Sequence, residues 1–176
     1  KQDQAGAHVL DVNVGLPGID EVSTMKKVIK LLQEVISLPL QIDSSNPDAI
    51  EQACRYYNGK PLINSVNGKM ETMEAIFPIV KKYGGVVIGL TLDENGIPAK
   101  AKDRYEIAKK IIATAKKFGI SKENIIIDCL VLTVSAQQKD VIETIKAVKM
   151  VKELGVHTVL GVSNVSFGLP LSLIHI

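Results

Sequence analysis

The sequence predicts an α/β protein built on a parallel sheet, and three observations support this prediction. Short apolar runs rich in β-branched residues alternate six times with longer segments whose apolar residues recur at helical spacing. Several of these runs show little alternation of apolar and polar residues, as expected of parallel strands covered on both faces. No linker and no change of composition separates the units, so we expect a single domain.

The runs that we interpret as strands are short, and most of them end in polar residues. They are His8–Asn13, Leu38–Asp43, Pro61–Asn64, Gly85–Leu92, Asn124–Asp128 and His157–Val162.

The segments between these runs have the pattern of amphipathic helices. Asn46 and Pro47 are typical of a helix start and Gly59 of the position just past a helix end, which predicts a helix over 47–58. Glycines also follow two of the remaining apolar stripes. These stripes cover 25–36, about 71–83, 105–118 and 141–154, and the last of them includes Ile142 and Ile145.

Length decides between the two common parallel architectures. A closed (β/α)8 barrel typically needs about 250 residues, so six units in 176 residues correspond to about three quarters of one. A doubly wound sheet usually carries a G-x-G-x-x-G loop after its first strand, and the sequence contains none. We therefore expect an incomplete barrel over 1–170. The last residues, 171–176 (LSLIHI), look like a translated sequencing-adapter scar, so His175 receives no functional weight.

Composition excludes several classes of function. The chain has 21 Lys and Arg against 19 Asp and Glu, only 4% aromatic residues and no Trp, which disfavours nucleic acid as a partner. Two cysteines, Cys54 and Cys129, are too few for a disulfide framework, and the N-terminal residues do not resemble a signal peptide, so we expect a cytoplasmic protein. No apolar run approaches the roughly 18 residues that a membrane span requires.

The polar residues at the strand ends are the candidate site, because the active site of a parallel barrel forms at the carboxyl ends of its strands. Nearly all of them are acids or amides: Asp11, Asn13, Asp43, Asn64, Asp128 and, after the sixth run, Asn164. Singly, such residues often only cap a helix or close a turn. As a set, they suit a flat heterocycle with donors and acceptors on its edge, such as a pterin.

A pterin would use this set as follows. Its 2-amino group and N3–H can donate in parallel to Asp43, while its ring nitrogens and O4 can meet Asn64 and Asp128. No basic residue ends a strand to hold a phosphate. We expect no metal site, because His8 and His157 begin their strands, at the end opposite the candidate site.

The same residues lie in segments that resemble a known family. GAHVLDVNVG, LPLQIDSSNPDAIE, GKPLINSVNG, NIIIDCLVLTVSAQQ and TVLGVSNVSFGLP are similar to the pterin-binding domain of cobalamin-dependent methyltransferases, which include methionine synthases and methyltetrahydrofolate:corrinoid methyltransferases. The similarity runs from about Ala5 to Pro170. The family fold is a (β/α)8 barrel, which implies that this chain contains about strands two to seven.

The resemblance also implies a reaction and roles for individual residues. Asp43, Asn64 and Asp128 would bind the pterin ring of 5-methyltetrahydrofolate, and Asn164 would face N5, which carries the methyl group. Asp11 and Asn13 would line the same mouth. The methyl group would pass to cob(I)alamin on a separate corrinoid-binding domain or protein. Leu171 and Ser172 depart from the family pattern of a polar residue and an arginine after G-L-P, which removes an expected folate contact.

Two alternatives remain open at this stage. Dihydropteroate synthase shares the barrel and the pterin mouth, but its late S-R-K motif would fall at Ser163, where this chain continues with Asn164 and Val165. The second alternative is a folate-binding fragment without catalytic activity, because an unclosed barrel leaves sheet edges and part of its core exposed.

Overall fold

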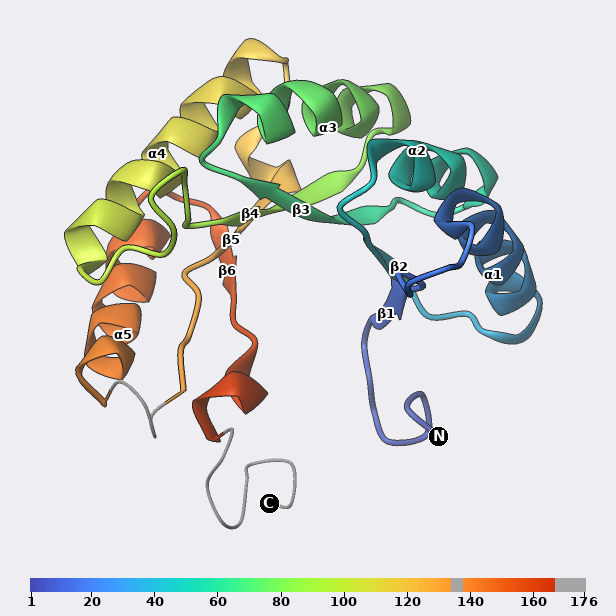
Figure 1. Cartoon of the computed structure of the whole chain (residues 1–176), viewed down its shortest axis with the longest axis horizontal. Coiled ribbons are helices and arrows are strands. Elements are labelled where there is room, and N and C mark those ends of the chain that lie inside the picture. Colours follow the sequence, from blue (N-terminus) through green and yellow to red (C-terminus); the bar gives the residue numbers. More distant parts are fainter. Residues whose placement is uncertain (134–137, 167–176) are drawn as a thin grey trace.

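The chain forms one parallel sheet of six strands in the order β1-β2-β3-β4-β5-β6, as its computed structural model shows for residues 1–133 and 138–166. The strands are β1 (Leu10–Asn13), β2 (Leu40–Asp43), β3 (Leu62–Asn67), β4 (Val86–Leu90), β5 (Ile125–Asp128) and β6 (His157–Val159). The sheet curves like part of a barrel wall, and β1 and β6 lie at its two unpaired ends (Figure 1). The α/β barrel-type prediction is confirmed, with the barrel open.

Five α-helices cover the convex face of the sheet (Figure 1). They are α1 (Glu21–Val35), α2 (Pro47–Tyr56), α3 (Met70–Tyr83), α4 (Ala101–Lys117) and α5 (Gln138–Lys152), with short 3-10 helices η1 (Lys122–Asn124) and η2 (Val162–Ser166). Asn46 caps α2 as expected, since its side chain accepts from the Asp48 backbone N–H at 3.0 Å. The apolar stripes in the sequence thus located α1, α3, α4 and α5, and the capping residues located α2.

The hydrophobic core lies between the sheet and these helices. Leu40 and Ile42 of β2, Ile63 of β3 and Ile127 of β5 are at most 1% exposed and belong to one continuous cluster that includes Phe77 of α3. Side chains alternate along a strand, so the residues between them face the concave side. The alternation of buried and exposed residues along β1, β2 and β5 thus places their polar residues on the inner face of the curve.

The structure corrects several element boundaries. Strand β3 continues to Asn67, three residues past the expected end, because a register shift between Asn64 and Val66 lets Val66 return to the core. Strand β6 ends at Val159, and the segment that was expected to extend it enters η2 instead. The strand expected from His8 starts at Leu10.

One expected helix face is also wrong. Ile142 and Ile145 of α5 are 56% and 53% exposed, whereas Thr144, Ala147 and Val151 of the same helix are buried. The physical reason is that α5 packs against α4 and β6, and Thr144 on its inner side contacts Arg104 of α4. Ile142 and Ile145 lie off this contact and face solvent.

Within the described ranges, no helix is long and apolar enough to cross a membrane. Cys54 and Cys129 are free and buried. A turn at Asp93–Gly96 is closed by hydrogen bonds between these two residues. The segment 171–176, interpreted as a scar, lies outside the described residues.

Candidate functional site

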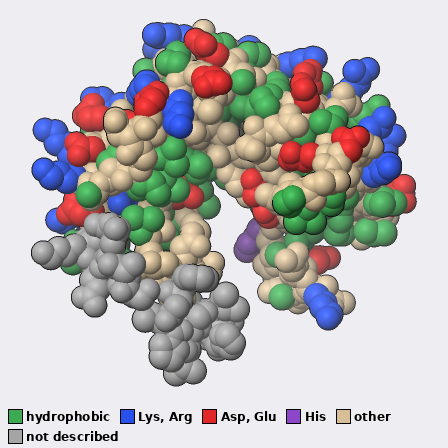
Figure 2. Space-filling view, viewed as in Figure 1, with side chains coloured by type: hydrophobic (Ala, Val, Ile, Leu, Met, Phe, Trp, Pro, Cys, Tyr) green, Lys and Arg blue, Asp and Glu red, His purple; other side chains and the backbone are tan. Residues whose placement is uncertain are grey.

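Strand register brings three of the predicted site residues together. Asn13 of β1 is paired with Asp43 of β2, and Asp43 is paired with Asn64 of β3. Residues paired in this way point to the same face of a sheet. The Asn13 side-chain Nδ2 donates to Asp43 Oδ2 at 3.1 Å, while Asn13 Oδ1 accepts from the Gly15 backbone N–H at 3.0 Å. The three side chains thus form a row on the concave face, which Figure 2 shows hollowed between the ends of the sheet.

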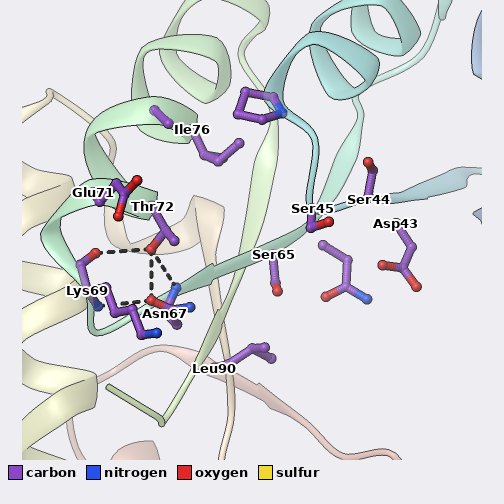
Figure 3. A pocket seen from close by; sticks show the side chains of 13 residues that line it. Asp43, Ser44, Ser45, Ser65, Asn67, Lys69, Glu71, Thr72, Ile76 and Leu90 are labelled. Carbon is purple, nitrogen blue, oxygen red and sulfur yellow. Dashed lines mark hydrogen bonds between the residues drawn. The ribbon is translucent and has the colours of Figure 1, made fainter. Parts of the chain in front are cut away.

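A cavity of about 530 Å³ opens beside this row. Asp43 and Ser44 lie at one end of it, and Asn67, Lys69 and Thr72 lie at the other (Figure 3). Among the described residues, the Asn64 side-chain amide has no hydrogen-bond partner, and Asp43 receives one hydrogen bond for two oxygens. Both groups therefore have hydrogen-bonding capacity left for a ligand.

Residues at the start of α2 hold the loop after Asp43 in place. The Ser44 backbone N–H donates to the Asn64 carbonyl at 3.1 Å, and the Ser44 hydroxyl donates to Glu21 Oε1 of α1. The same hydroxyl accepts from the Asn46 backbone N–H at 3.0 Å. The end of β2 is therefore fixed against both α1 and β3, which keeps the Asp43 carboxylate beside Asn64.

Asp11 lies on the same face, one residue pair further from the strand ends. It is paired with Gln41, whose Nε2 donates to Asp11 Oδ1 at 2.5 Å. Burial raises the pKa of Asp11, the Gln41 hydrogen bond opposes this rise, and the neighbouring charge of Asp43 adds to it. Asp11 thus lies on the concave face with its carboxylate engaged by Gln41, and it is not among the residues that line the cavity.

Asp128 approaches the site from β5. It is paired with Leu90 of β4, which in turn is paired with Asn67 of β3. Asp128 Oδ1 accepts from the Leu130 backbone N–H at 2.7 Å. Burial raises the pKa of Asp128, and this hydrogen bond partly offsets the rise. Asp128 therefore lies on the concave face, in a row other than that of Asp43 and Asn64.

Asn164 lies in η2, after β6, and is exposed. Its backbone N–H donates to the Gly161 carbonyl at 3.1 Å. Its side chain rests against Gly161, because a Cβ atom built on Gly161 would lie 3.0 Å from Asn164 Nδ2. Within the described residues, no hydrogen bond joins the Asn164 side chain to Asp43, Asn64 or Asp128.

Sequence reasoning missed several residues that line the cavity, above all Asn67, Lys69 and Thr72. Thr72 donates to Asn67 Oδ1 at 2.8 Å, and Asn67 Oδ1 also accepts from the Lys69 backbone N–H at 2.9 Å. The sequence feature that could have revealed these residues is Asn67, the second asparagine in the segment NSVNG. It marks the true end of β3, at which a polar residue was to be expected.

The described part of the chain contains no group of three or more His, Cys, Asp or Glu side chains that could hold a metal ion. Burial raises the pKa of the Cys129 thiol to about 12, so this cysteine stays protonated at neutral pH. The chemistry that the site offers is therefore hydrogen bonding by carboxylates and amides.

Comparison with known proteins agrees with this chemistry. The family described as pterin binding enzyme matches residues 1–175. The chain is 34% identical over 180 residues to the methionine synthase of Mycobacterium leprae, covering 96% of this chain and 15% of the relative. It is 28% identical to the methylcorrinoid:tetrahydrofolate methyltransferase of Eubacterium limosum, covering 96% of this chain and 64% of that protein. The chain thus spans less than two thirds of the length of these curated relatives.

Solved structures agree on the fold. Dihydropteroate synthase from Xanthomonas albilineans in complex with 7,8-dihydropteroate superposes with a TM-score of 0.74 at 21% identity, over 92% of this chain and 60% of that one. The dihydropteroate synthase of Vibrio fischeri gives a TM-score of 0.72 at 16% identity, over 94% of this chain and 65% of that one. At such identities the likeness concerns the fold alone. The resemblance first seen in the sequence is confirmed, and the chain belongs to the family of pterin-binding enzymes.

Proposed function

We propose that this chain binds 5-methyltetrahydrofolate and catalyses transfer of its N5 methyl group to cob(I)alamin carried by a separate corrinoid-binding domain or protein. The observation that carries the proposal is the row of Asn13, Asp43 and Asn64 beside the cavity. The family and the names of two of its relatives, methionine synthase and methylcorrinoid:tetrahydrofolate methyltransferase, support the choice of reaction.

The row fits the edge of a pterin. Asp43 offers carboxylate oxygens to the 2-amino group and to N3–H, and Asn13 keeps this carboxylate oriented through its 3.1 Å hydrogen bond. Asn64 offers both a donor and an acceptor to the ring nitrogens and O4. Asp128 contributes a further acceptor from β5, because the Leu130 N–H occupies only one of its oxygens.

In the transfer, the bond between N5 and the methyl carbon breaks and a bond between that carbon and cobalt forms. The electron pair of the new bond comes from cob(I)alamin, and the pair of the broken bond stays on N5, which must gain a proton. An amide is no general acid, so we assign Asn164 to hydrogen bonding at N5, with the proton arriving through a network of carboxyl groups and water.

The test is stopped-flow measurement of cob(I)alamin absorbance with the full chain and increasing 5-methyltetrahydrofolate. We expect saturable loss of cob(I)alamin that requires both the protein and the folate. In Asn164→Ala the rate should fall by about 100-fold, the size found when one donor to a reacting atom is removed. Asn58→Ala, which changes an exposed asparagine after α2, is the matched control and should react like the unchanged chain.

Each other outcome has a defined meaning. Equal rates for Asn164→Ala and the unchanged chain would contradict the role of Asn164. Folate binding without loss of cob(I)alamin would favour the alternative of a folate-binding module. Condensation of a dihydropterin pyrophosphate with p-aminobenzoate, without methyl transfer, would favour dihydropteroate synthase activity instead.

A further inference from the structure

Arg104, in the first turns of α4, is fully buried, which is unusual for a guanidinium group. Its Nε donates to the Pro98 carbonyl at 2.7 Å. Its Nη1 lies within hydrogen-bond distance of the Cys129 carbonyl at 3.0 Å, the Leu130 carbonyl at 2.8 Å and Thr144 Oγ1 at 2.7 Å. A buried charge is tolerated only when it is well hydrogen-bonded, so these contacts define where the segment after β5 must lie.

The segment that Arg104 contacts follows directly on Asp128 and has an unusual backbone. Leu130 has a φ of 56°, in the left-handed region that residues with a Cβ atom rarely adopt. In this conformation its N–H points back to Asp128 Oδ1, at 2.7 Å, while its carbonyl points to Arg104 and also accepts from Thr144 Oγ1 at 3.1 Å. The same residue is therefore held from both sides, by Asp128 and by the Arg104–Thr144 pair.

Asp128 itself is anchored at its backbone. Its carbonyl accepts from the Thr91 N–H at 3.0 Å and lies 3.2 Å from the Thr91 hydroxyl. These backbone hydrogen bonds do not fix the Asp128 side chain, whereas the hydrogen bond from the Leu130 N–H does. One carboxylate oxygen is thereby held, and the other is left to the concave face.

We propose that Arg104 is a positioning residue: by holding the Cys129 and Leu130 carbonyls, it sets the Leu130 N–H that orients the Asp128 carboxylate toward the ligand. This inference rests on the proposed role of Asp128 in pterin binding. It extends that role to a side chain of α4 that contacts the segment after Asp128 and does not line the cavity. Thr144 of α5 acts with Arg104, since it contacts both Arg104 and Leu130.

The charged groups next to this segment include Asp128 and Arg104, both of which act on the Cys129 thiol. Cys129 next to Asp128 is buried, and burial raises its pKa to about 12, so it is neutral at neutral pH. From α5, the Glu143 carboxylate accepts from the Ala101 N–H of α4 at 2.9 Å, and this hydrogen bond first, then that from Lys146, lowers the pKa of Glu143. The pKa of Glu143 is thus shifted down, whereas burial shifts the pKa of Asp128 up.

A rival explanation is that Arg104 only joins α4 to α5. Both explanations predict loss of stability when Arg104 is replaced. Removing the Arg104 charge raises the pKa of Asp128 under either explanation, so the deciding variant is Thr144→Val, which changes no charge. In that variant only the positioning role predicts a rise in the pKa of Asp128, because the Leu130 N–H stabilises the charged carboxylate and lowers its pKa. The titration of Asp128 therefore separates the two.

The experiment follows the carboxyl carbon of Asp128 by NMR as a function of pH in the full chain without folate, with the signal assigned through Asp128→Asn. We expect Arg104→Met to raise the pKa of Asp128 and to weaken folate binding by about tenfold, the loss of one hydrogen bond. Arg104→Lys should bring both the pKa of Asp128 and the folate affinity part of the way back to those of the unchanged chain, because lysine supplies one cationic donor. Lys102→Met, at an exposed position of the same helix, is the control and should change neither.

An unchanged Asp128 titration in folded Arg104→Met would overturn the proposal. An unchanged Asp128 titration in folded Thr144→Val would likewise overturn it, since this variant removes the Thr144 hydroxyl from Leu130 while nearly keeping the volume and leaving the charge unchanged. Because the titration is recorded without ligand, it remains decisive even if the chain proves not to bind a folate. Failure of the proposed function and failure of this inference are thus distinguishable.

Discussion

At the β1–β3 end of the sheet, strand register alone brings Asn13, Asp43 and Asn64 together, whereas at the β5–β6 end Asp128 and Asn164 depend on the segments that follow the strands. The register is set by buried alternate residues such as Ile42 and Ile63, which are fully buried. The other end depends on particular hydrogen bonds and on one left-handed residue, Leu130. Substitutions should therefore affect the two ends in different ways.

The largest effect should be common to both ends, because they share one core. Ile63→Ala on β3 and Ile127→Ala on β5 each delete buried methyl groups from a fully buried position. We expect each to lower the free energy of unfolding by about 2–5 kcal/mol. Urea unfolding followed by circular dichroism measures this. If Ile63→Ala lowered the free energy of unfolding strongly and Ile127→Ala left it nearly unchanged, the β5 end would not be part of the same core.

Asp43→Asn should show the next largest effect, a loss of folate affinity that arises at the β1–β3 end alone. In the proposed complex the Asp43 carboxylate accepts from the 2-amino group and from N3–H of the pterin. An asparagine in its place presents its own NH₂ donor to one of these two groups. A hydrogen bond to a charged group contributes about 1.5–3 kcal/mol, so affinity for 5-methyltetrahydrofolate should fall by about 100-fold. Isothermal titration calorimetry measures it, with Asp48→Asn on exposed α2 as the control. Less than a threefold change, against the roughly 100-fold expected, would remove Asp43 from the site.

Gly161→Ala should show a smaller effect, confined to the β6 end. The added Cβ would lie 3.0 Å from Asn164 Nδ2, so the amide must move. We expect methyl transfer to slow by about tenfold while folate affinity stays the same, since small misplacements at a reacting centre reduce rate. Gly15→Ala is the counterpart at the β1 end, where the new Cβ would make an ordinary contact at 3.5 Å with Asn13 Oδ1. Equal losses in the two variants would argue against the difference between the ends.

The smallest effect concerns pH. Burial raises the pKa of Asp128 above its ordinary value of 3.8, so the folded chain holds this proton more tightly than the unfolded chain. Asp128 therefore costs no stability below pH 3.8, and its cost grows as the pH rises through the raised pKa. Asp128→Asn keeps the acceptor for Leu130 and removes the charge. It should raise the melting temperature at pH 7 and lose this advantage near pH 3.8, which calorimetry at a series of pH values measures. A constant difference across pH would contradict the account.

Much of the fold followed from the sequence, because apolar periodicity determines which faces are buried. Asp43 and Asp128 were predicted correctly as the polar residues that end their strands, since each follows an apolar run, whereas β3 continues past Asn64 to Asn67. Asn67 was missed because the first polar residue was taken as the end of β3, and a bulge after Asn64 carries the strand further. A bulge depends on the pairing with β4, which local sequence does not reveal.

The burial of Arg104 and the exposure of Ile142 could not be predicted from the sequence, for the same reason. A charged residue in the first turns of a helix normally faces solvent, and only the approach of the Cys129–Leu130 segment and α5 buries Arg104. Ile142 belongs to an apolar stripe, and its exposure depends on which neighbours pack against α5. Both outcomes are set by tertiary packing between α4, α5 and β5.

The most direct test of the central claim observes Asn64 itself. In a titration of the full chain with 5-methyltetrahydrofolate, two-dimensional NMR can follow the side-chain NH₂ groups of Asn64 and Asn13, with that of exposed Asn58 as an internal reference. The account predicts that the Asn64 and Asn13 signals shift together and saturate with one dissociation constant, while Asn58 stays in place. Saturable folate binding that leaves Asn64 unmoved would contradict it.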